Sequence, residues 1–247
     1  MATLGIIGGT GLTQLKGLTI TRSEAVKTPY GKPSAPLVHG RINAVDVVFL
    51  ARHGEKHSIP PHRVNYRANL FALREAGVED VIAVAAVGGI REDMAPGVIA
   101  LPEQIIDYTW GRKHTFFEDE LETVTHIDFT TPYCETLRGR LLAASQACHV
   151  AVIDGGVYGA TQGPRLETAA EIDRMQRDGC TLVGMTGMPE AALARELGLC
   201  YASCAVVANR AAGRGDGEIS MEDIESTLHK AMGQVGVLLA GFMKINE

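Results

Sequence analysis

Short apolar runs alternate with stretches of helical periodicity along most of the chain. The strand-like runs are LGIIG, VDVVFLA, VIAVAAV, TLVGMT and CYASCAVVA, at residues 4–8, 45–51, 81–87, 181–186 and 200–208. Several of them have no polar face, which is typical of strands covered on both sides. Helices are predicted at 65–77, 137–147, 167–179, 189–198 and 220–243. This alternation predicts an α/β fold built around one sheet.

Some helix boundaries are marked by particular residues. Pro189 suits the first turn of its predicted helix, and Gly198 suits the position just past its end. Ser220 with Asp223 resembles an N-cap pattern for the last helix. No repeat, linker or break in composition divides the 247 residues, so we expect a single domain over 1–247.

Composition and charge disfavour several classes of function. The net charge is −6, the sequence pI is about 5.8, and aromatic residues make up only 5%. Without long basic runs or many aromatic side chains, nucleic acid and anionic membranes are unsuitable partners. We find no signal peptide and no apolar stretch approaching ~20 residues, so we expect a cytoplasmic protein. Five cysteines without CxxC spacing indicate reduced thiols.

The first predicted strand runs into a glycine-rich loop, LGIIGGTGL, at residues 4–12. A dinucleotide fingerprint needs G-x-G-x-x-G followed by a long helix. Gly8, Gly9 and Gly11 do not have that spacing, and the segment that follows is too short for such a helix. Thr10 instead offers a hydroxyl where glycines let the backbone approach a ligand. The loop is compatible with an anion site or with a plain tight turn.

Three further strand ends carry groups that suit phosphate. Arg52 offers a fork of donors, and His53 beside it is expected to add a donor whose charge follows pH. Backbone N–H groups near Ala86 can face an anion, and Thr186 comes directly before a helix N-terminus. Such strand ends gather at one edge of an α/β sheet. The expected phosphate site comprises Thr10, Arg52, His53, Ala86 and Thr186.

The histidines in this region raise the alternative of a zinc site. His53, His57 and His62 lie near Glu55, but the order is H-x-E-x-H and not H-E-x-x-H. Gly54 and two prolines also interrupt the helix which that motif requires. We therefore expect no metal, while histidines without any function are still a possible interpretation.

Five motifs, in this order, resemble the trimeric purine nucleoside phosphorylases, and among them the 5′-methylthioadenosine phosphorylase branch. They are GIIGGTGL, LARHGEKHSIPPHRVNYRANLFAL, GGIREDMAPGVIALPEQIID, GATQGPRLETAAEI and GMTGMPEAALARELGLCYAS. The resemblance implies a single-domain nucleoside phosphorylase fold with a central mixed sheet flanked by helices. It also implies a homotrimer, with pairing into a dimer of trimers left open, and phosphorolysis of a purine nucleoside. Inorganic phosphate is then a co-substrate, and no metal or organic cofactor is needed.

Positions in these motifs imply roles for individual residues. Thr10, Arg52, His53, the Ala86 backbone and Thr186 correspond to the phosphate ligands of the family. Met185 corresponds to the ribose contact, Met221 to the contact with the 5′ substituent, and His126 to a contact in a neighbouring subunit. The base pocket corresponds to Pro164, Leu166, Glu167 and Asn209. The resemblance makes Asn209, His53 and Thr186 the expected catalytic residues.

The chain also departs from the methylthioadenosine branch. That branch has an aspartate where Asn209 stands, a second acid where Ala211 stands and a serine where Glu167 stands. Ala85 replaces a hydroxyl residue. The pair Glu167 and Asn209 instead resembles the branch that cleaves 6-oxopurine nucleosides, although that branch tends to have a histidine near Met221.

Hydrogen-bond chemistry turns these departures into a substrate prediction. Hypoxanthine presents an N1–H donor and an O6 acceptor, whereas adenine presents an N1 acceptor and an N6 amino donor. The carboxylate of Glu167 only accepts at neutral pH, so it suits N1–H. Asn209 can donate to O6 and accept from N7–H as the base leaves. Met221 suits a methylthio group better than a hydroxyl.

The expected substrate is therefore 5′-methylthioinosine, which phosphate converts to hypoxanthine and 5-methylthioribose 1-phosphate in purine salvage. Alternatives within the class are phosphorolysis of 5′-methylthioadenosine and then of inosine or guanosine. A nicotinamide-dependent oxidoreductase and a non-catalytic nucleoside-binding protein are alternatives from other classes. Purely structural roles are also open for Glu167 as the start of a helix, Asn209 as a strand end and Met221 as part of the core.

Overall fold

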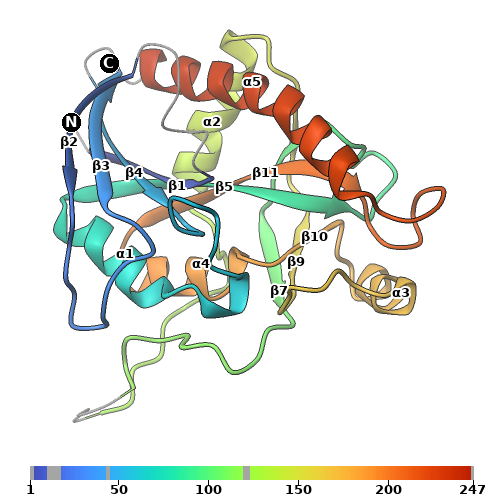
Figure 1. Cartoon of the computed structure of the whole chain (residues 1–247), viewed down its shortest axis with the longest axis horizontal. Helices are drawn as coiled ribbons and strands as arrows, with labels where there is room; N and C mark the ends of the chain where they lie inside the picture. The colour runs from blue at the N-terminus through green and yellow to red at the C-terminus, as the bar shows by residue number, and fades with distance from the viewer. Residues whose placement is uncertain (1–2, 10–17, 43–44, 119–122, 246–247) are drawn as a thin grey trace.

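The computed structural model describes residues 3–9, 18–42, 45–118 and 123–245. Within these ranges, eleven strands form one mixed sheet with helices on both faces (Figure 1). The strands are β1 (Thr3–Gly8), β2 (Thr19–Glu24), β3 (Leu37–Ile42), β4 (Val45–Ala51), β5 (Val78–Gly89), β6 (Ile99–Leu101), β7 (Gln104–Asp107), β8 (Val152–Asp154), β9 (Val157–Ala160), β10 (Leu182–Gly184) and β11 (Cys200–Arg210). The helices are α1 (Tyr66–Glu75), α2 (Glu135–Ala147), α3 (Ala169–Arg177), α4 (Gly187–Glu196) and α5 (Met221–Ile245), with a 3₁₀ turn at Pro61–Arg63.

The twelve-residue strand β5 is the centre of the sheet. It pairs in parallel with β1 on one side and with β11 on the other, and β4 lies parallel to β1. Towards its end, β5 also pairs with β10, which runs antiparallel to it. One path through the sheet is β2-β3-β4-β1-β5-β10-β9-β7, while β11, β6 and β8 continue from the other side of β5. The expected mixed sheet flanked by helices is confirmed.

Two helical layers cover the sheet (Figure 1). Helices α2 and α5 pack on each other and on β11, whereas α1 and α4 pack together on the opposite face. Local caps fix where some helices begin: the Asn65 side chain accepts from the Ala68 amide, and Thr168 with Glu171 forms a capping box before α3. No helix in the described ranges is long and apolar enough to cross a membrane.

All five predicted helices are present, and the five predicted strands are correct in type. Gly198 has a φ of +68° directly after α4, as its predicted position beyond the helix end requires. The Asp223 amide donates to the Ser220 hydroxyl over 3.4 Å at the start of α5. The apolar pattern missed β2, β3 and β6–β9, because β2 is exposed along its whole length and most of the others have only three or four residues.

A disulfide joins Cys134, just before α2, to Cys200, the first residue of β11. The Cys134 amide also donates to the Tyr201 carbonyl oxygen over 2.8 Å, so the backbone brings these two segments side by side. The two cysteines are 66 residues apart, and no local spacing announces the pair. The expectation of five reduced thiols is wrong for this pair. Cys148, Cys180 and Cys204 are free.

Candidate active site

Several of the predicted phosphate ligands meet at one edge of the sheet. Gly8 and Ala51 lie in register at the ends of β1 and β4, and the Arg52 amide donates to the Gly8 carbonyl oxygen over 3.0 Å. Val183 of β10 pairs with Gly88 of β5 in the antiparallel sense, which directs the following residues 184–186 back along β5. The ends of β1, β4 and β10 therefore surround the middle of β5. Thr10 lies outside the described residues.

The central strand is open to solvent near its beginning, at Glu79, and again in its middle. Most residues of β5 are buried, but Ala85 is half-buried and Ala86 is exposed. Ala86 pairs with the buried Val206 of β11, so it lies well inside the sheet and not at an edge. Exposure at the middle of a core strand marks a depression in the surface. This is where the predicted phosphate site was expected.

Arg52 is only 2% exposed. It forms an ion pair with Glu190 of α4, which is completely buried. Its Nε and Nη2 atoms donate to the two carboxylate oxygens over 2.8 Å each, and Nη1 donates to the Val84 carbonyl oxygen over 2.9 Å. Three of the five N–H groups are thus used within the described chain. Tyr201 donates a further hydrogen bond to Glu190 over 2.9 Å.

Burial and the ion pair have opposite effects on the pKa of Arg52. Burial alone would lower the pKa of Arg52, but Glu190 more than reverses this effect and the pKa is raised. Burial, followed by the charge of Glu190, raises the pKa of Tyr201 well above its usual value. Arg52 is therefore a permanent cation whose position is fixed by α4 and β11.

His53 has a defined tautomer. Its Nδ1 lies 2.8 Å from the Ile59 carbonyl oxygen, and because a carbonyl only accepts, Nδ1 carries the hydrogen. Burial and the neighbouring charge of Arg52 lower the pKa of His53 to about 4. The ring is neutral at pH 7 and Nε2 presents a lone pair. A neutral ring with this tautomer differs from the expectation that His53 is a hydrogen-bond donor whose charge changes with pH. No group of three His, Cys, Asp or Glu side chains in the described ranges can hold a metal ion.

Met185 and Thr186 link β10 to α4. Thr186 is 6% exposed and occupies the N-cap position of α4, and its amide donates to the Tyr158 hydroxyl over 3.4 Å. Met185 packs directly over Gly163, where a Cβ atom would overlap its sulfur. Gly163 also has a φ of +58°, which suits glycine. The link thus places the predicted ribose and phosphate contacts next to the loop that follows β9.

Arg112 connects these loops, although no sequence motif indicated it. Its side chain is 8% exposed, and its guanidinium donates to the carbonyl oxygens of Met185 (2.8 Å), Met188 (2.5 Å), Thr161 (3.1 Å) and Gln162 (2.8 Å). It also lies over the ring of Tyr66 and donates to its hydroxyl. Among the described residues, the contacts of this buried cation include no carboxylate. Arg112 therefore holds the loop after β9 against the loop after β10.

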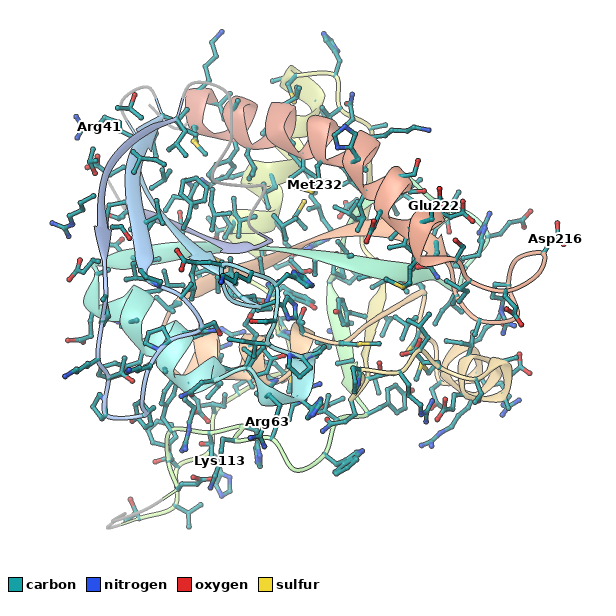
Figure 2. All side chains as sticks on the ribbon, in the orientation of Figure 1. Arg41, Arg63, Lys113, Asp216, Glu222 and Met232 are labelled. Carbon is teal, nitrogen blue, oxygen red and sulfur yellow. A yellow bond between two sulfur atoms is a disulfide. The ribbon has the colours of Figure 1, made fainter. Side chains whose placement is uncertain are left out.

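A cavity of about 600 Å³ adjoins the end of β11. Leu166 and Asn209 line it, together with the 211–220 loop and the first turns of α5. Figure 2 shows Asp216 at the tip of that loop and Glu222 at the beginning of α5. Met221 is 62% exposed between Ser220 and Glu222, so it does not belong to the core. Pro164 is exposed in the loop after β9.

The two polar residues predicted to contact the base each have one hydrogen-bond partner within the described chain. Glu167 is half-buried, and its Oε1 accepts from the Thr161 hydroxyl over 2.6 Å. Asn209 is also half-buried, and its Nδ2 donates to the Arg210 carbonyl oxygen over 2.6 Å. That bond fixes the orientation of the amide, since only nitrogen can donate to a carbonyl. The second Nδ2 hydrogen and Oδ1 stay available.

Ala211 is more deeply buried than Glu167 and Asn209. It is 2% exposed and belongs to a buried apolar cluster with Ile172, Met175 and Val183. Its amide donates to the Gly89 carbonyl oxygen over 2.9 Å. An acid at this position would bury a carboxylate among apolar side chains, which is costly.

His126 does not join the site of its own chain. It is exposed, and none of the described hydrogen bonds joins it to Arg52, Thr186 or the other predicted ligands. Lys113, which like His126 belongs to the connection between β7 and α2, lies far from Asp216 in Figure 2. The structure therefore brings Arg52, His53, Ala86, Met185 and Thr186 together and leaves His126 outside.

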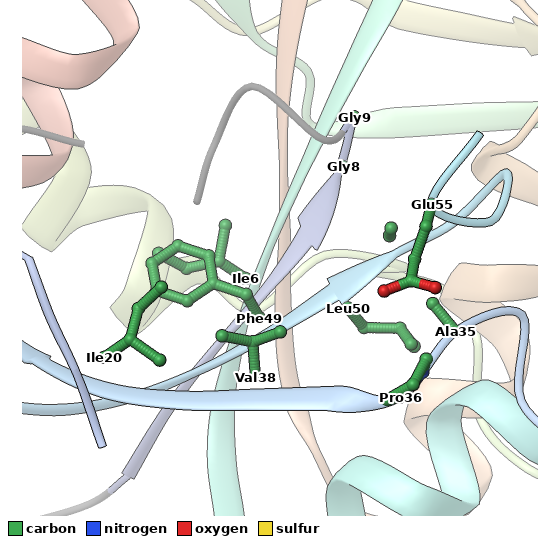
Figure 3. Close-up of a pocket in the computed structure, with 11 residues that line it drawn as sticks. Ile6, Gly8, Gly9, Ile20, Ala35, Pro36, Val38, Phe49, Leu50 and Glu55 are labelled. Atoms are coloured by element: carbon green, nitrogen blue, oxygen red, sulfur yellow. The ribbon is translucent and has the colours of Figure 1, made fainter. Parts of the chain in front are cut away.

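A second cavity, of about 270 Å³, lies beside Gly8 and Gly9 (Figure 3). Apolar side chains such as Ile6, Val38 and Phe49 form most of its wall, and Glu55 is its one charged residue within the described chain. An apolar wall with a carboxylate does not suit an anion. This cavity is therefore not the phosphate site.

Sequence reasoning missed four residues that organise the site: Arg112, Thr161, Glu190 and Tyr201. A glutamate in the first turn of a helix is favoured by the helix dipole, so Glu190 has an ordinary local explanation. That explanation does not indicate an arginine partner 138 residues away. Arg112 lies between elements and bonds mainly to carbonyl oxygens, which carry no sequence signal. The only available signal was that GATQGPRLETAAEI places Thr161 near Glu167.

Comparison with known proteins agrees with this geometry. The family model of the phosphorylase superfamily matches residues 3–244. A probable S-methyl-5′-thioinosine phosphorylase from Pseudomonas syringae pv. tomato is 57% identical over 240 residues, covering 97% of this chain and 98% of that protein. A 6-oxopurine nucleoside phosphorylase from Pyrococcus furiosus is 43% identical, covering 93% of this chain and 88% of that protein.

A solved structure is also similar. Methylthioadenosine phosphorylase from Schistosoma mansoni in complex with adenine superposes with a TM-score of 0.94 at 32% identity, covering 99% of this chain and 92% of that chain. The matching family model spans nearly the whole chain, and two relatives exceed 40% identity. The protein therefore belongs to the phosphorylase superfamily, as a nucleoside phosphorylase of the purine type.

Proposed function

We propose that the protein cleaves a 6-oxopurine 5′-methylthionucleoside with phosphate. The reaction would convert 5′-methylthioinosine and phosphate to hypoxanthine and 5-methylthioribose 1-phosphate, as a step of purine salvage. The observation that carries this choice of base is the pair at its expected pocket: Glu167 is held as an acceptor and Asn209 is free to donate and accept. The names of the Pseudomonas and Pyrococcus relatives support the same base class.

Base recognition would rest on complementary hydrogen bonds. The free Oε2 of Glu167 would accept from N1–H of hypoxanthine. The second Nδ2 hydrogen of Asn209 would donate to O6, and its Oδ1 would accept from N7–H of the departing base. Adenine would place its N1 lone pair against the carboxylate. A buried polar group left without its partner can discriminate by up to ~10⁴–10⁵-fold.

Phosphate would bind where the ends of β1, β4 and β10 surround Ala86. The fixed cation of Arg52, the N-terminus of α4 at Thr186 and the backbone near Ala86 would hold it, with Thr10 as a further donor. The lone pair on Nε2 of His53 would accept from a hydroxyl group of the phosphate. The glycosidic bond would break ahead of attack at C1′, and a phosphate held in position would lower the entropic part of the barrier. Asn209, His53 and Thr186 are the proposed catalytic residues.

The remaining parts of the proposal concern the 5′ end and the assembly. Met185 would contact the ribose, and Met221 would lie toward the methylthio group with Pro164 and Leu166 near the base. His126 is exposed, and we infer that it contacts a neighbouring subunit in a homotrimer. We further infer a cytoplasmic enzyme that needs no metal or organic cofactor.

A substrate comparison tests this function. The purified protein would receive 5′-methylthioinosine, 5′-methylthioadenosine and inosine in turn, with and without phosphate, and the free base would be quantified. We expect phosphate-dependent release of hypoxanthine, fastest from 5′-methylthioinosine. Equal or better turnover of 5′-methylthioadenosine would contradict the proposed base. Binding without release of base would indicate a non-catalytic nucleoside-binding protein, and a spectral response to NADH would favour an oxidoreductase.

Asn209→Asp sharpens the test of base recognition. An aspartate cannot donate to O6 when ionised, so kcat/KM for 5′-methylthioinosine should fall at least ~100-fold. The KM for phosphate should stay near the wild-type value. An unchanged preference among the three nucleosides would mean that the base is recognised by other residues.

A further inference from the structure

Thr161 is held rigidly at the end of β9. Its side chain is buried, at 7% exposure, and its amide donates to the Gly184 carbonyl oxygen over 2.8 Å. Its own carbonyl oxygen accepts from Arg112. A β-branched side chain on a backbone fixed from both sides has little rotational freedom. The direction of its hydroxyl group is therefore set by the fold.

That hydroxyl has one hydrogen and two acceptors within reach. Oε1 of Glu167 lies 2.6 Å away and the Gly184 carbonyl oxygen lies 3.3 Å away. The shorter contact, to a carboxylate, is the stronger one. A carboxylate oxygen only accepts, so the hydroxyl hydrogen is directed to Oε1 and holds the carboxylate in one orientation. Oε2 is left for another donor.

Glu167 needs such support, because it lies in an irregular connection between β9 and α3. The Thr161 hydroxyl provides the one hydrogen bond to its carboxylate among the described residues. A glutamate without this bond would sample many rotamers, and ordering them on binding would weaken the contact with the base.

We propose that Thr161 is a positioning residue that makes Glu167 a fixed hydrogen-bond acceptor and thereby sets the preference for 6-oxopurines over 6-aminopurines. The inference rests on the proposed function, since it concerns recognition of the base. It adds a residue that acts through Glu167 and does not itself contact the substrate.

Thr161→Val tests this role, because valine keeps the shape of threonine and removes only the donor. We expect kcat/KM for 5′-methylthioinosine to fall on the order of tenfold, as for a lost hydrogen bond to a charged group, while that for 5′-methylthioadenosine stays level or rises. Thr161→Ser should restore the ratio of the two values. The KM for phosphate should not change in either variant.

Thr181→Val is a matched control. Thr181 is 8% exposed, and its hydroxyl bonds to the backbone of Val157 between β10 and β9, away from Glu167. This variant should lower the melting temperature and leave the ratio of the two substrates unchanged. If Thr161→Val behaves in the same way, the threonine has only a structural role and the inference is wrong.

A double-mutant cycle isolates the route through Glu167. In the Glu167→Ala background, Thr161→Val should have little further effect on the substrate ratio, because the acceptor of the Thr161 hydroxyl is already absent. Equal effects in both backgrounds would overturn the inference, and so would a serine variant as impaired as the valine variant. If Thr161→Val folds poorly, Thr161→Ala provides the same comparison. A wild-type enzyme without preference for 5′-methylthioinosine would instead refute the proposed function.

Discussion

The phosphate end and the base end of the candidate site are stabilised in different ways. At the phosphate end, Arg52 and Glu190 form an ion pair inside the protein, at 2% and 0% exposure, with Tyr201 bonded to the same carboxylate. At the base end, Leu166 and Met221 are 39% and 62% exposed, and Asn209 bonds only to the neighbouring backbone within the described chain. Phosphate binding as proposed would thus use groups fixed by the core, whereas the proposed recognition of the nucleoside would rely on loops that can vary without disturbing the sheet.

Glu190→Gln should have the largest effect on stability. It leaves Arg52 buried without its opposite charge, so the free energy of unfolding should fall by about 3–5 kcal/mol. Urea denaturation measures this. Asp46→Asn is the control, because Asp46 pairs with Arg41 on the surface, and its denaturation midpoint should hardly move. Equal small effects of the two substitutions would mean that the phosphate end does not depend on the core.

Arg112→Met breaks the connection between the two ends. The loops after β9 and β10 would lose their common donor, and misplacement of about 1 Å can reduce kcat/KM ~100-fold. Added methylguanidinium should restore part of the activity. Arg138→Met removes another buried arginine, bonded to Leu101 and Asp154 far from the site, and should lower stability without changing kcat/KM at 25 °C. Wild-type kcat/KM in Arg112→Met would show that the loops hold their positions unaided.

His53 makes the phosphate end sensitive to acid. Its pKa falls from about 6.5 to about 4 on folding, so between these values the unfolded chain binds more protons. The stabilisation is complete above pH ~6.5 and is lost as the pH falls toward ~4, and it amounts to about 2 kcal/mol after allowance for partial exposure. Denaturation of wild type and His53→Gln from pH 4 to 7 measures it. Parallel pH profiles for the two proteins would contradict the lowered pKa.

Arg214→Ala should have the smallest effect, at the base end. Arg214 donates to Asp173 and Gln176 of α3, which ties the 211–220 loop to that helix. Without it, the KM for the nucleoside should rise a few-fold, since an exposed ion pair contributes little. The KM for phosphate should not change. An equal rise in both constants would indicate that the two ends are coupled through this loop.

The apolar pattern predicted the buried elements and missed those without a hydrophobic signal. Strands β1, β4, β5 and β11 are rich in Val, Ile and Ala, and the ends of β1 and β4 place Arg52 and His53 as expected. Ala86 was expected at a strand end, but β5 continues to Gly89 and Ala86 lies within it. The exposed β2 and the short β6–β9 have no such pattern. They form because neighbouring strands supply their partners.

Contacts between distant residues could not be predicted. The pairs Arg52–Glu190 and Cys134–Cys200 span 138 and 66 residues, and each partner alone has an ordinary local explanation. Arg112 bonds chiefly to carbonyl oxygens, which every residue possesses. Side-chain chemistry selected Glu167 and Asn209 as candidates for contact with the base, but only the fold shows that the Thr161 hydroxyl bonds to Glu167.

The burial of Ala211 limits how base preference could change during evolution. The methylthioadenosine branch has acids at both 209 and 211, so a conversion by point mutation would need two steps. Asn209 and Ala211 border the same cavity, but Ala211 is 2% exposed and also packs against Ile172 and Met175. An acid introduced there would destabilise the protein before it could bind adenine. In this fold, an acid at position 211 would therefore need compensating changes in the apolar cluster around it.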